Sequence, residues 1–388
     1  MLIQWFLSGT VRRAVELRQH VGRLLNEQRD LLAPEAVTQI DAASSELQSV
    51  IGSACSKKEL EEAAAKFVTV ADRWLKPYPS PGIRDNVKEF FVAATVILAF
   101  TTFFLQLTKI PTGSMQPTLF GITETDLRAD PNAQFPGFLT RTYRYWSAGV
   151  SYYRLTAKTD GVVEEIEPAK LVLPFIKKQR VRFAGQWYTL WFPPDDLEKR
   201  AGLQRGQAFR AGEDFVRAEV VSGDHLLVDR LTYNFRRPER GEIIVFKTKG
   251  IRGLVQDQLY IKRMVAMPGE RVRIGDDRHL RINDVRLDAA TLRFENVYGF
   301  TASTGRWKYI GHVNQAVANR LTQAMLAPRF ENGTAEVQVP DDQYLAMGDN
   351  TLNSLDSRAW GGLPESNIIG KCWFVYWPFT ARFGWGNR

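Results

Sequence analysis

Eighteen consecutive residues without a charge, Phe90 to Leu107, constrain this chain more than any other feature of its sequence. Folded as a helix, this segment would be about 27 Å long, close to the roughly 30 Å hydrocarbon thickness of a bilayer. Apolar side chains would lie on every face of the helix, and no polar positions recur with a period of 3.6 residues. We therefore predict a transmembrane helix over residues 90–108 rather than the buried core helix of a soluble protein.

Basic residues on the two flanks predict the orientation of this helix. Only Lys109 follows it closely, whereas four basic residues precede it: Arg73, Lys76, Arg84 and Lys88. Because Lys and Arg are enriched on the cytoplasmic side of membrane helices, we expect a single-pass protein with its N-terminus in the cytoplasm. Residues 109–388 would then form an extracytoplasmic domain. The apolar run at residues 1–7 is too short for a secretory signal.

Residues 1–77 have the apolar spacing of amphipathic helices. Apolar side chains recur three, four and seven positions apart, and Ser56 with Glu59 matches a capping box. The prolines that follow cannot continue a helix, so residues 78–89 are predicted to be a linker. We expect a small cytoplasmic bundle that packs on itself. A surface for a cytoplasmic partner is the alternative, and a membrane segment within residues 1–8 would overturn the assignment.

Composition excludes several classes of protein. The chain is 44% hydrophobic and 24% charged, which is typical of a folded protein rather than a disordered one. With two cysteines and four histidines, neither a disulfide framework nor a metal site is expected, and we expect no cofactor. The net charge of +8 is spread thinly over the residues after position 108 and forms no dense basic patch. We therefore expect no nucleic-acid partner.

The sequence after the predicted span changes to strands. Short runs of β-branched and aromatic residues, bounded by turn signals, occur at 225–235, 242–247, 259–267, 270–274 and 372–377. This pattern predicts a mainly β domain, anchored by one transmembrane helix and preceded by the N-terminal α-helical region. Residues 121–220 are rich in aromatic and charged residues but weakly patterned, and we interpret them as an inserted subdomain.

A serine in the segment IPTGSMQPTL, residues 110–119, is a candidate nucleophile. Ser114 lies seven residues beyond Leu107, so it would be held near the membrane surface, and Gly113 would let a substrate approach the backbone. A serine in such a loop is more often only a turn residue. The chain has no Gly-x-Ser-x-Gly elbow, and His225 is the only histidine in a motif-like setting. A serine nucleophile would therefore need another base.

Lys262, in the predicted strand LYIKRMVAM, is the candidate for that base. Period-two alternation places it on one face with Tyr260 and Met264, while Arg263 falls on the other face. Burial among such groups disfavours the charged amine and lowers its pKa, so that it could act as a general base near neutral pH. The alternative is a lysine that extends from a half-buried strand into water.

A third polar cluster lies in the segment MGDNTLNSLDSRAWG, residues 347–361. Asp356 and Arg358 could form a structural ion pair there, and a serine hydroxyl of the segment could orient the lysine amine. The segment lacks the alternating ligands and terminal Glu of an EF-hand calcium loop.

Taken together and in this order, the segments closely resemble bacterial type I signal peptidase. The resemblance covers residues 90–119, 222–274 and 344–378 and includes SGDHLLVDRLTYNFRRPERGEIIVF and YIKRMVAMPGE. It implies a Ser–Lys protease with a mostly β domain outside the bacterial cytoplasmic membrane. Its partners would be the signal peptides of preproteins and the phospholipid bilayer, and cleavage would follow small residues at positions −1 and −3.

The resemblance also implies the role of each site residue. Ser114 would be the nucleophile and Lys262 the general base. The supporting residues are Thr112, which forms the oxyanion hole with the Ser114 amide; Ser354, which hydrogen-bonds the lysine amine; Asp356 and Arg358, which form a supporting ion pair; and Ile110 and Ile261, which line the substrate pockets.

The chain departs from the family pattern in two places. The interval from Ser114 to Gly223 is unusually long, and the region before the span has no counterpart in the core of the family. Two alternatives therefore stay open. One is a related Ser–Lys membrane protease with one dedicated substrate, and the other is an inactive membrane-tethered domain that binds partners.

Overall fold

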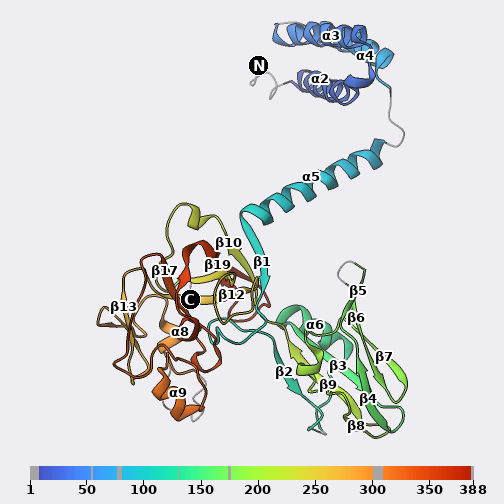
Figure 1. Cartoon of the computed structure of the whole chain (residues 1–388). Helices are drawn as coiled ribbons and strands as arrows, with labels where there is room; N and C mark the ends of the chain where they lie inside the picture. Colours follow the sequence, from blue (N-terminus) through green and yellow to red (C-terminus); the bar gives the residue numbers. More distant parts are fainter. Residues whose placement is uncertain are drawn as a thin grey trace. The chain divides into compact units, whose positions relative to one another are not determined.

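The computed structural model describes residues 8–53, 56–76, 81–130, 132–173, 176–299 and 309–385. The chain divides into two compact units, residues 1–95 and residues 96–388, which we describe separately (Figure 1). The short apolar run at residues 1–7, residue 77 and the start of the predicted linker, residues 78–80, lie outside the described residues.

Three α-helices pack together in the described residues 8–53 and 56–76 of the first unit, in the region where apolar spacing predicts them. They are α2 (Gly9–Gln28), α3 (Pro34–Gly52) and α4 (Lys57–Trp74). Their apolar stripes meet in one core around Leu25, Ile40, Leu47 and Phe67. The Ser56–Glu59 capping box is present at the start of α4, where it pairs backbone N–H groups that the first turn leaves without a partner. The region therefore packs on itself.

The apolar helix α5 (Pro81–Phe103) differs from the predicted span at both ends. It begins at Pro81, since proline suits the first position of a helix, so residues 81–89 are helical rather than a linker. It ends at Phe103 because the next residues form strand β1 (Leu105–Lys109), which pairs antiparallel with β10 (His225–Asp229). By length and composition, Gly82–Phe103 could cross a membrane, and its apolar side chains are exposed in the structure.

An antiparallel sheet with the strand order β1-β10-β19-β11-β12-β17-β18 organises the second unit. Its other strands are β11 (Ile243–Lys247), β12 (Leu259–Ala266), β17 (Gln343–Met347), β18 (Leu363–Pro364) and β19 (Ile368–Trp377), and β20 (Gly384–Trp385) pairs with β19. Strand β12 is central: Lys262 pairs with Ile244 on β11, and Arg263 pairs with Met347 on β17. The mainly β character predicted for this part of the chain is confirmed.

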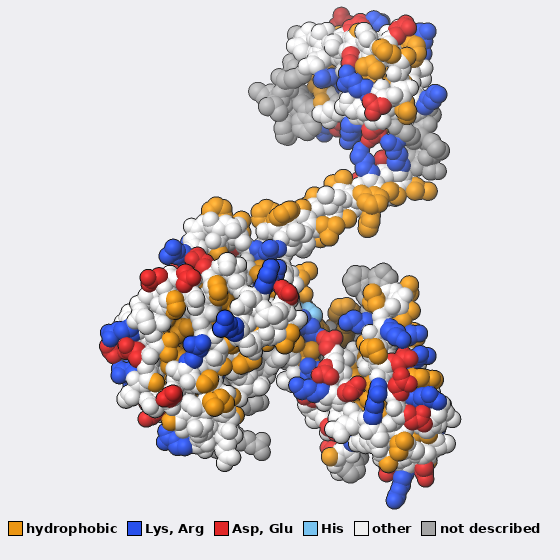
Figure 2. Space-filling view, in the orientation of Figure 1, with side chains coloured by type: hydrophobic (Ala, Val, Ile, Leu, Met, Phe, Trp, Pro, Cys, Tyr) orange, Lys and Arg blue, Asp and Glu red, His pale blue; other side chains and the backbone are white. Residues whose placement is uncertain are grey.

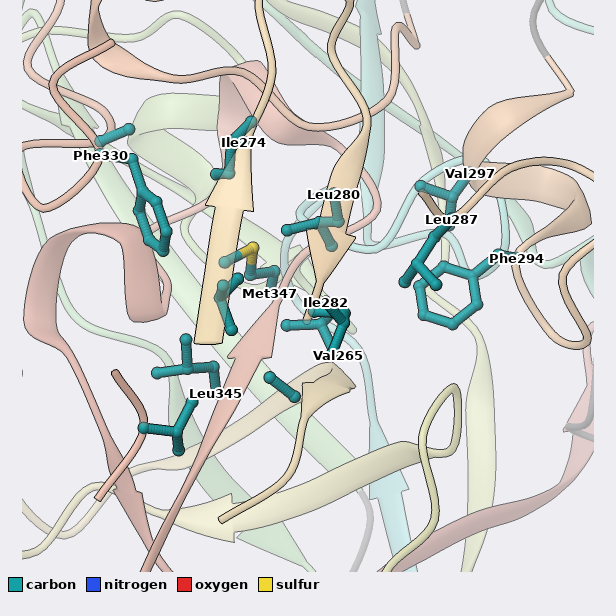
Figure 3. Packing of buried hydrophobic residues seen from close by; sticks show 14 of the residues in the cluster. Val265, Ile274, Leu280, Ile282, Leu287, Phe294, Val297, Phe330, Leu345 and Met347 are labelled. Atoms are coloured by element: carbon teal, nitrogen blue, oxygen red, sulfur yellow. The ribbon is translucent and has the colours of Figure 1, made fainter. Parts of the chain in front are cut away.

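A second, four-stranded sheet packs beside the end of β12. Its order is β15-β14-β13-β16, with β13 (Arg271–Ile274), β14 (Leu280–Ile282), β15 (Val285–Arg286) and β16 (Glu336–Gln338). Val265 and Met347 pack with Ile274, Leu280 and Phe330 in a fully buried core (Figure 3). This core fixes the end of β12 and the start of the segment after β17, which are the two elements that carry the polar clusters.

The weakly patterned residues after position 121 form two small sheets. One has the order β2-β9-β3, with β2 (Thr123–Asp126), β3 (Val150–Thr156) and β9 (Asp214–Val221). The other has the order β5-β6-β4-β8, with β7 paired to β6; the strands are β4 (Gly161–Ile166), β5 (Lys170–Leu173), β6 (Ile176–Phe183), β7 (Gln186–Trp191) and β8 (Ala208–Phe209). They share a core around Val181, Phe183 and Phe215, so this part of the chain has a hydrophobic core of its own.

Candidate active site

The structure brings Ser114 and Lys262 together across 148 positions of sequence. The Nζ atom of Lys262 lies 2.9 Å from Ser114 Oγ, and both side chains are about 95% buried. Ser114 is in the loop that follows β1, and Lys262 projects from the middle of β12. At this distance the Oγ–H can donate to a neutral amine, which is the geometry that a serine nucleophile and its base require.

Burial sets the protonation of this lysine. It lowers the pKa of Lys262 to about 8; the carboxylate of Asp356 opposes this shift, and the guanidinium of Arg358 adds to it. The amine also donates to the carbonyl oxygen of Ile261 at 2.9 Å and lies 5.4 Å from the centre of the Tyr260 ring. The amine is therefore neutral in a substantial fraction of molecules near pH 8.

The segment after β17 holds the serine loop by its backbone. The N–H of Asn350 donates to Ser114 O, and the Asn350 side-chain amide donates to Gly113 O, both at 3.0 Å. Gly348 lies directly behind this contact, where a Cβ atom would be 2.2 Å from Ser354 Oγ and 2.5 Å from Ser114 O. Only glycine therefore allows the two segments to come this close.

Gly348→Ala is expected to lower the cleavage rate at least about tenfold, because a displacement near 1 Å can cost far more than that in rate. The comparison is Gly137→Ala, at a glycine with open space around its Cβ position and a φ of −60°. Both variants would be assayed on the same preprotein, with thermal unfolding measured in parallel. Equal rates for Gly348→Ala and wild type would contradict the tight packing between these segments.

Asp356 and Arg358 form the expected ion pair, and both are fully buried. Arg358 Nε and Nη2 each lie 2.8 Å from a different oxygen of Asp356. Burial raises the pKa of the Asp356 carboxyl, but Arg358 outweighs this effect, so that the pKa lies below its usual range. The Asp356 carboxylate also accepts a hydrogen bond from the Gly348 N–H, with 3.0 Å between the nitrogen and Oδ2. The pair therefore shapes the turn that carries Ser354.

Ser354 lines the same pocket as Lys262. It does not make the hydrogen bond to the Lys262 amine that the resemblance implies. Its Oγ atom is buried and has no hydrogen-bond partner among the described residues. The amine instead donates to Ser114 and to the Ile261 carbonyl. Ser354 therefore contributes to the same pocket as the lysine a hydroxyl without a hydrogen-bond partner in the described part of the chain.

A second buried ion pair was not predicted from the sequence. Arg263 donates to Asp349 through two nitrogens, at 2.8 and 2.6 Å, and both side chains are about 99% buried. The hydroxyl of Thr118 donates to the same carboxylate. This cluster joins β12, the segment after β17 and the serine loop, so it fixes the three parts of the site relative to one another. Strand alternation in the sequence predicted that Arg263 points away from Lys262, but it did not identify Asp349 as the partner of Arg263.

Asp349→Asn is expected to lower the free energy of unfolding of the second unit by about 3–5 kcal/mol, because it leaves the Arg263 guanidinium buried with a neutral partner. Denaturant unfolding of the detergent-solubilised chain would measure this change. Asp284→Asn, at a half-exposed ion pair with Arg273, is the control and should change stability by under about 1 kcal/mol. If Asp349→Asn lowered the free energy of unfolding as little as Asp284→Asn does, the proposed role of Asp349 in holding the site together would be contradicted.

A pocket of about 430 Å³ opens in front of the Ser114–Lys262 contact. Its wall is mostly apolar and is formed by Pro111, Thr112, Leu259, Tyr260, Ile261, Met325, Leu326, Leu352, Asn353, Ser354 and Leu355. Thr112 and Ile261 both line this pocket. Ile110 does not line the pocket: it is 1% exposed and packs behind the site with Met115 and Leu226, because β1 pairing turns it into the core.

No group of three or more His, Cys, Asp or Glu side chains in the described part of the chain is placed to hold a metal ion.

A serine and a lysine in contact at the base of an apolar pocket are typical of a serine hydrolase with a lysine base. The family described as "Signal peptidase, peptidase S26" matches residues 212–377. "Signal peptidase I" of Bacillus caldolyticus is 30% identical over 160 residues, which cover 41% of this chain and 73% of that protein. The chain belongs to the signal peptidase I family.

Two further comparisons have different coverage. "Probable signal peptidase I-2" of Synechocystis sp. is 33% identical over 156 residues, which cover 40% of this chain and 56% of that protein. The match thus spans little more than half the length of this relative. The crystal structure of a signal peptidase I from Enterococcus faecalis is 24% identical, covers 35% of this chain and 97% of that chain, and has a TM-score of 0.23.

Proposed function

We propose that this protein is a membrane-bound serine endopeptidase that removes N-terminal signal peptides from exported preproteins. The single observation that carries the proposal is the 2.9 Å contact between Ser114 Oγ and Lys262 Nζ, buried at the base of an apolar pocket. Membership in the signal peptidase I family supports the substrate class. A shallow pocket with the apolar side chain of Ile261 suits small residues at positions −1 and −3 of the substrate.

In the proposed mechanism, the neutral amine of Lys262 accepts the Ser114 Oγ proton while Oγ attacks the scissile carbonyl carbon. The tetrahedral oxyanion receives hydrogen bonds from the Thr112 hydroxyl and the Ser114 amide; a donor of this kind contributes about 3–4 kcal/mol. The Lys262 ammonium then gives its proton to the leaving amine, and a Ser114 ester forms. A water molecule, deprotonated by the same lysine, hydrolyses this ester and regenerates the serine.

The membrane would bring enzyme and substrate together. A signal peptide spans the bilayer as an apolar helix, and α5 would anchor the peptidase in the same membrane. A shared surface raises the effective concentration of the cleavage site. We place the N-terminus in the cytoplasm of a bacterial cell and the second unit on the outer face of the cytoplasmic membrane, on the basis of the basic residues before α5 and in its first turns.

The test is cleavage of a signal-bearing preprotein by the detergent-solubilised full-length chain, with the cut position read by mass spectrometry. A cut after a small-x-small sequence is the expected result. No cleavage of several unrelated preproteins by a well-folded chain would instead favour a protease with one dedicated substrate. No labelling by a serine-directed acylating inhibitor would favour an inactive tethered domain.

A further inference from the structure

Strand β5 is an edge strand whose four residues are all exposed. Leu171 is 65% exposed, Val172 44% and Leu173 58%, although an edge strand normally keeps its apolar residues on a covered face. It pairs only with β6 in the described part of its sheet, so its outer edge is free. An exposed apolar edge of this kind invites association unless something covers it.

Two exposed aromatic residues extend the apolar surface. Trp191, 53% exposed, pairs with Lys178 across the β6–β7 ladder, and Phe192, 59% exposed, donates its N–H to the Lys177 carbonyl. These side chains lie near the start of β6, where Ile176 pairs with Leu173 and Lys177 pairs with Leu171. We call Leu171, Val172, Leu173, Trp191 and Phe192 the hairpin patch. Tryptophan at the edge of an apolar surface is typical of a membrane–water interface.

The hairpin itself carries charge of one sign, and its nearest acidic side chains are Glu167, 3.4 Å from Lys170, and Asp195, 3.9 Å from Lys177. Lys170, Lys177 and Lys178 flank the hairpin patch, and no Asp or Glu occurs from residue 168 to residue 180. Figure 2 shows hydrophobic and basic side chains side by side at the β5–β6 end of this domain, whose place is seen in Figure 1. A surface of this composition is complementary to an anionic phospholipid headgroup layer with its acyl chains beneath.

Lys177, near the start of β6, is tied to the strand that follows α5. Lys109, the last residue of β1, has its amine 2.9 Å from Asp195 Oδ2, and Lys177 Nζ is 3.9 Å from Oδ1 of the same carboxylate. Because β1 has five residues, it spans about 17 Å, so one short strand connects this ion-pair group to the end of α5. This continuity favours the bilayer that α5 would enter over a distant protein partner.

We propose that the hairpin patch is a second membrane-binding element, which inserts into the interfacial layer of an anionic phospholipid bilayer. The apolar side chains of the hairpin patch enter the layer between headgroups and acyl chains, while the three lysines contact lipid phosphates. This inference does not depend on peptidase activity.

The test uses the full-length chain with Cys55 replaced by serine, since Cys372 is buried. An environment-sensitive fluorophore is attached at Leu173→Cys or, as a control, at Val285→Cys, which replaces a residue 66% exposed on β15 of the four-stranded sheet. Each protein is reconstituted in phosphatidylcholine vesicles with and without phosphatidylglycerol, and with brominated acyl chains as quenchers. We expect a blue shift and quenching at position 173 that increase with phosphatidylglycerol, and neither at position 285.

Lys170→Gln with Lys178→Gln tests the electrostatic part. Because each basic residue near an anionic surface contributes about fivefold to binding, this pair should reduce quenching at position 173 severalfold in anionic vesicles. A water-like fluorophore at position 173 in both vesicle types would overturn the proposal. A blue shift without quenching by brominated lipid would also overturn it, since protein rather than lipid would then cover the hairpin patch.

Discussion

Replacing Ser114 with alanine is expected to reduce preprotein cleavage by at least about 10⁴-fold, because the variant has no oxygen to form the acyl ester. The substitution removes one atom from a side chain that is 5% exposed and leaves the backbone contacts of Asn350 in place. Thermal unfolding should therefore change little. Cleavage is measured by the shortened product on a gel and by its mass, at equal enzyme concentrations.

The matched control for this experiment is Ser222→Ala. Ser222 Oγ lies 3.3 Å from His225 Nε2, so it is the alternative that a search for a serine–histidine pair would choose. Burial lowers the pKa of His225, which leaves its imidazole neutral and able to accept a proton. We expect Ser222→Ala to cleave like the wild type. If Ser222→Ala lost activity while Ser114→Ala retained it, Ser222 rather than Ser114 would be the nucleophile.

Short local patterns predicted part of the site. Strand alternation alone turns Lys262 and Arg263 to opposite faces, and the structure keeps this arrangement on β12. The closeness of Asp356 and Arg358 in the sequence suggested their ion pair, which the structure contains. The pairing of Lys262 with Ser114 came from the resemblance, since no local pattern relates residues so far apart.

Long-range pairing explains what could not be predicted. The apolar run continues through Leu107, but β10 pairs with residues 105–109, so a strand replaces the last turn of the expected helix. The same pairing turns Ile110 into the core and away from the pocket. The Arg263–Asp349 pair joins residues 86 positions apart, and no spacing rule relates them. The bulges and short strands of the inserted sheets likewise weaken the two-residue period.

The pH dependence of cleavage is expected to follow the Lys262 amine. Since burial lowers its pKa to about 8, kcat/KM should rise about tenfold per pH unit below that value and level off above it. Lys262→Ala should be inactive for lack of a base, and Lys262→Arg should also be inactive because a guanidinium stays protonated. Lys247→Arg, at an exposed position of β11, is the control and should retain activity.

The same amine should leave a signature in stability. Its pKa is about 8 in the folded protein and near 10.5 when exposed, so the unfolded chain binds more protons between these values. The free energy of unfolding therefore rises with pH in this window, by about 1 kcal/mol from pH 7 to pH 9 for this group alone. In Lys262→Met this contribution is absent. The difference between wild type and Lys262→Met, measured by denaturant unfolding at the two pH values, isolates it from other titrating groups.

These two measurements separate a general base from a merely structural lysine. A lysine base with an ordinary pKa would give kcat/KM values that keep rising to pH 10, and its methionine variant would share the pH dependence of wild-type stability. A lysine that takes no part in proton transfer would leave the pH profile of kcat/KM unrelated to its own pKa. A buried base gives a plateau above pH 8 and a stability difference that changes over the same range. Because both effects come from the desolvation of one amine, the midpoint of the activity profile should coincide with the pH at which the stability difference begins to change.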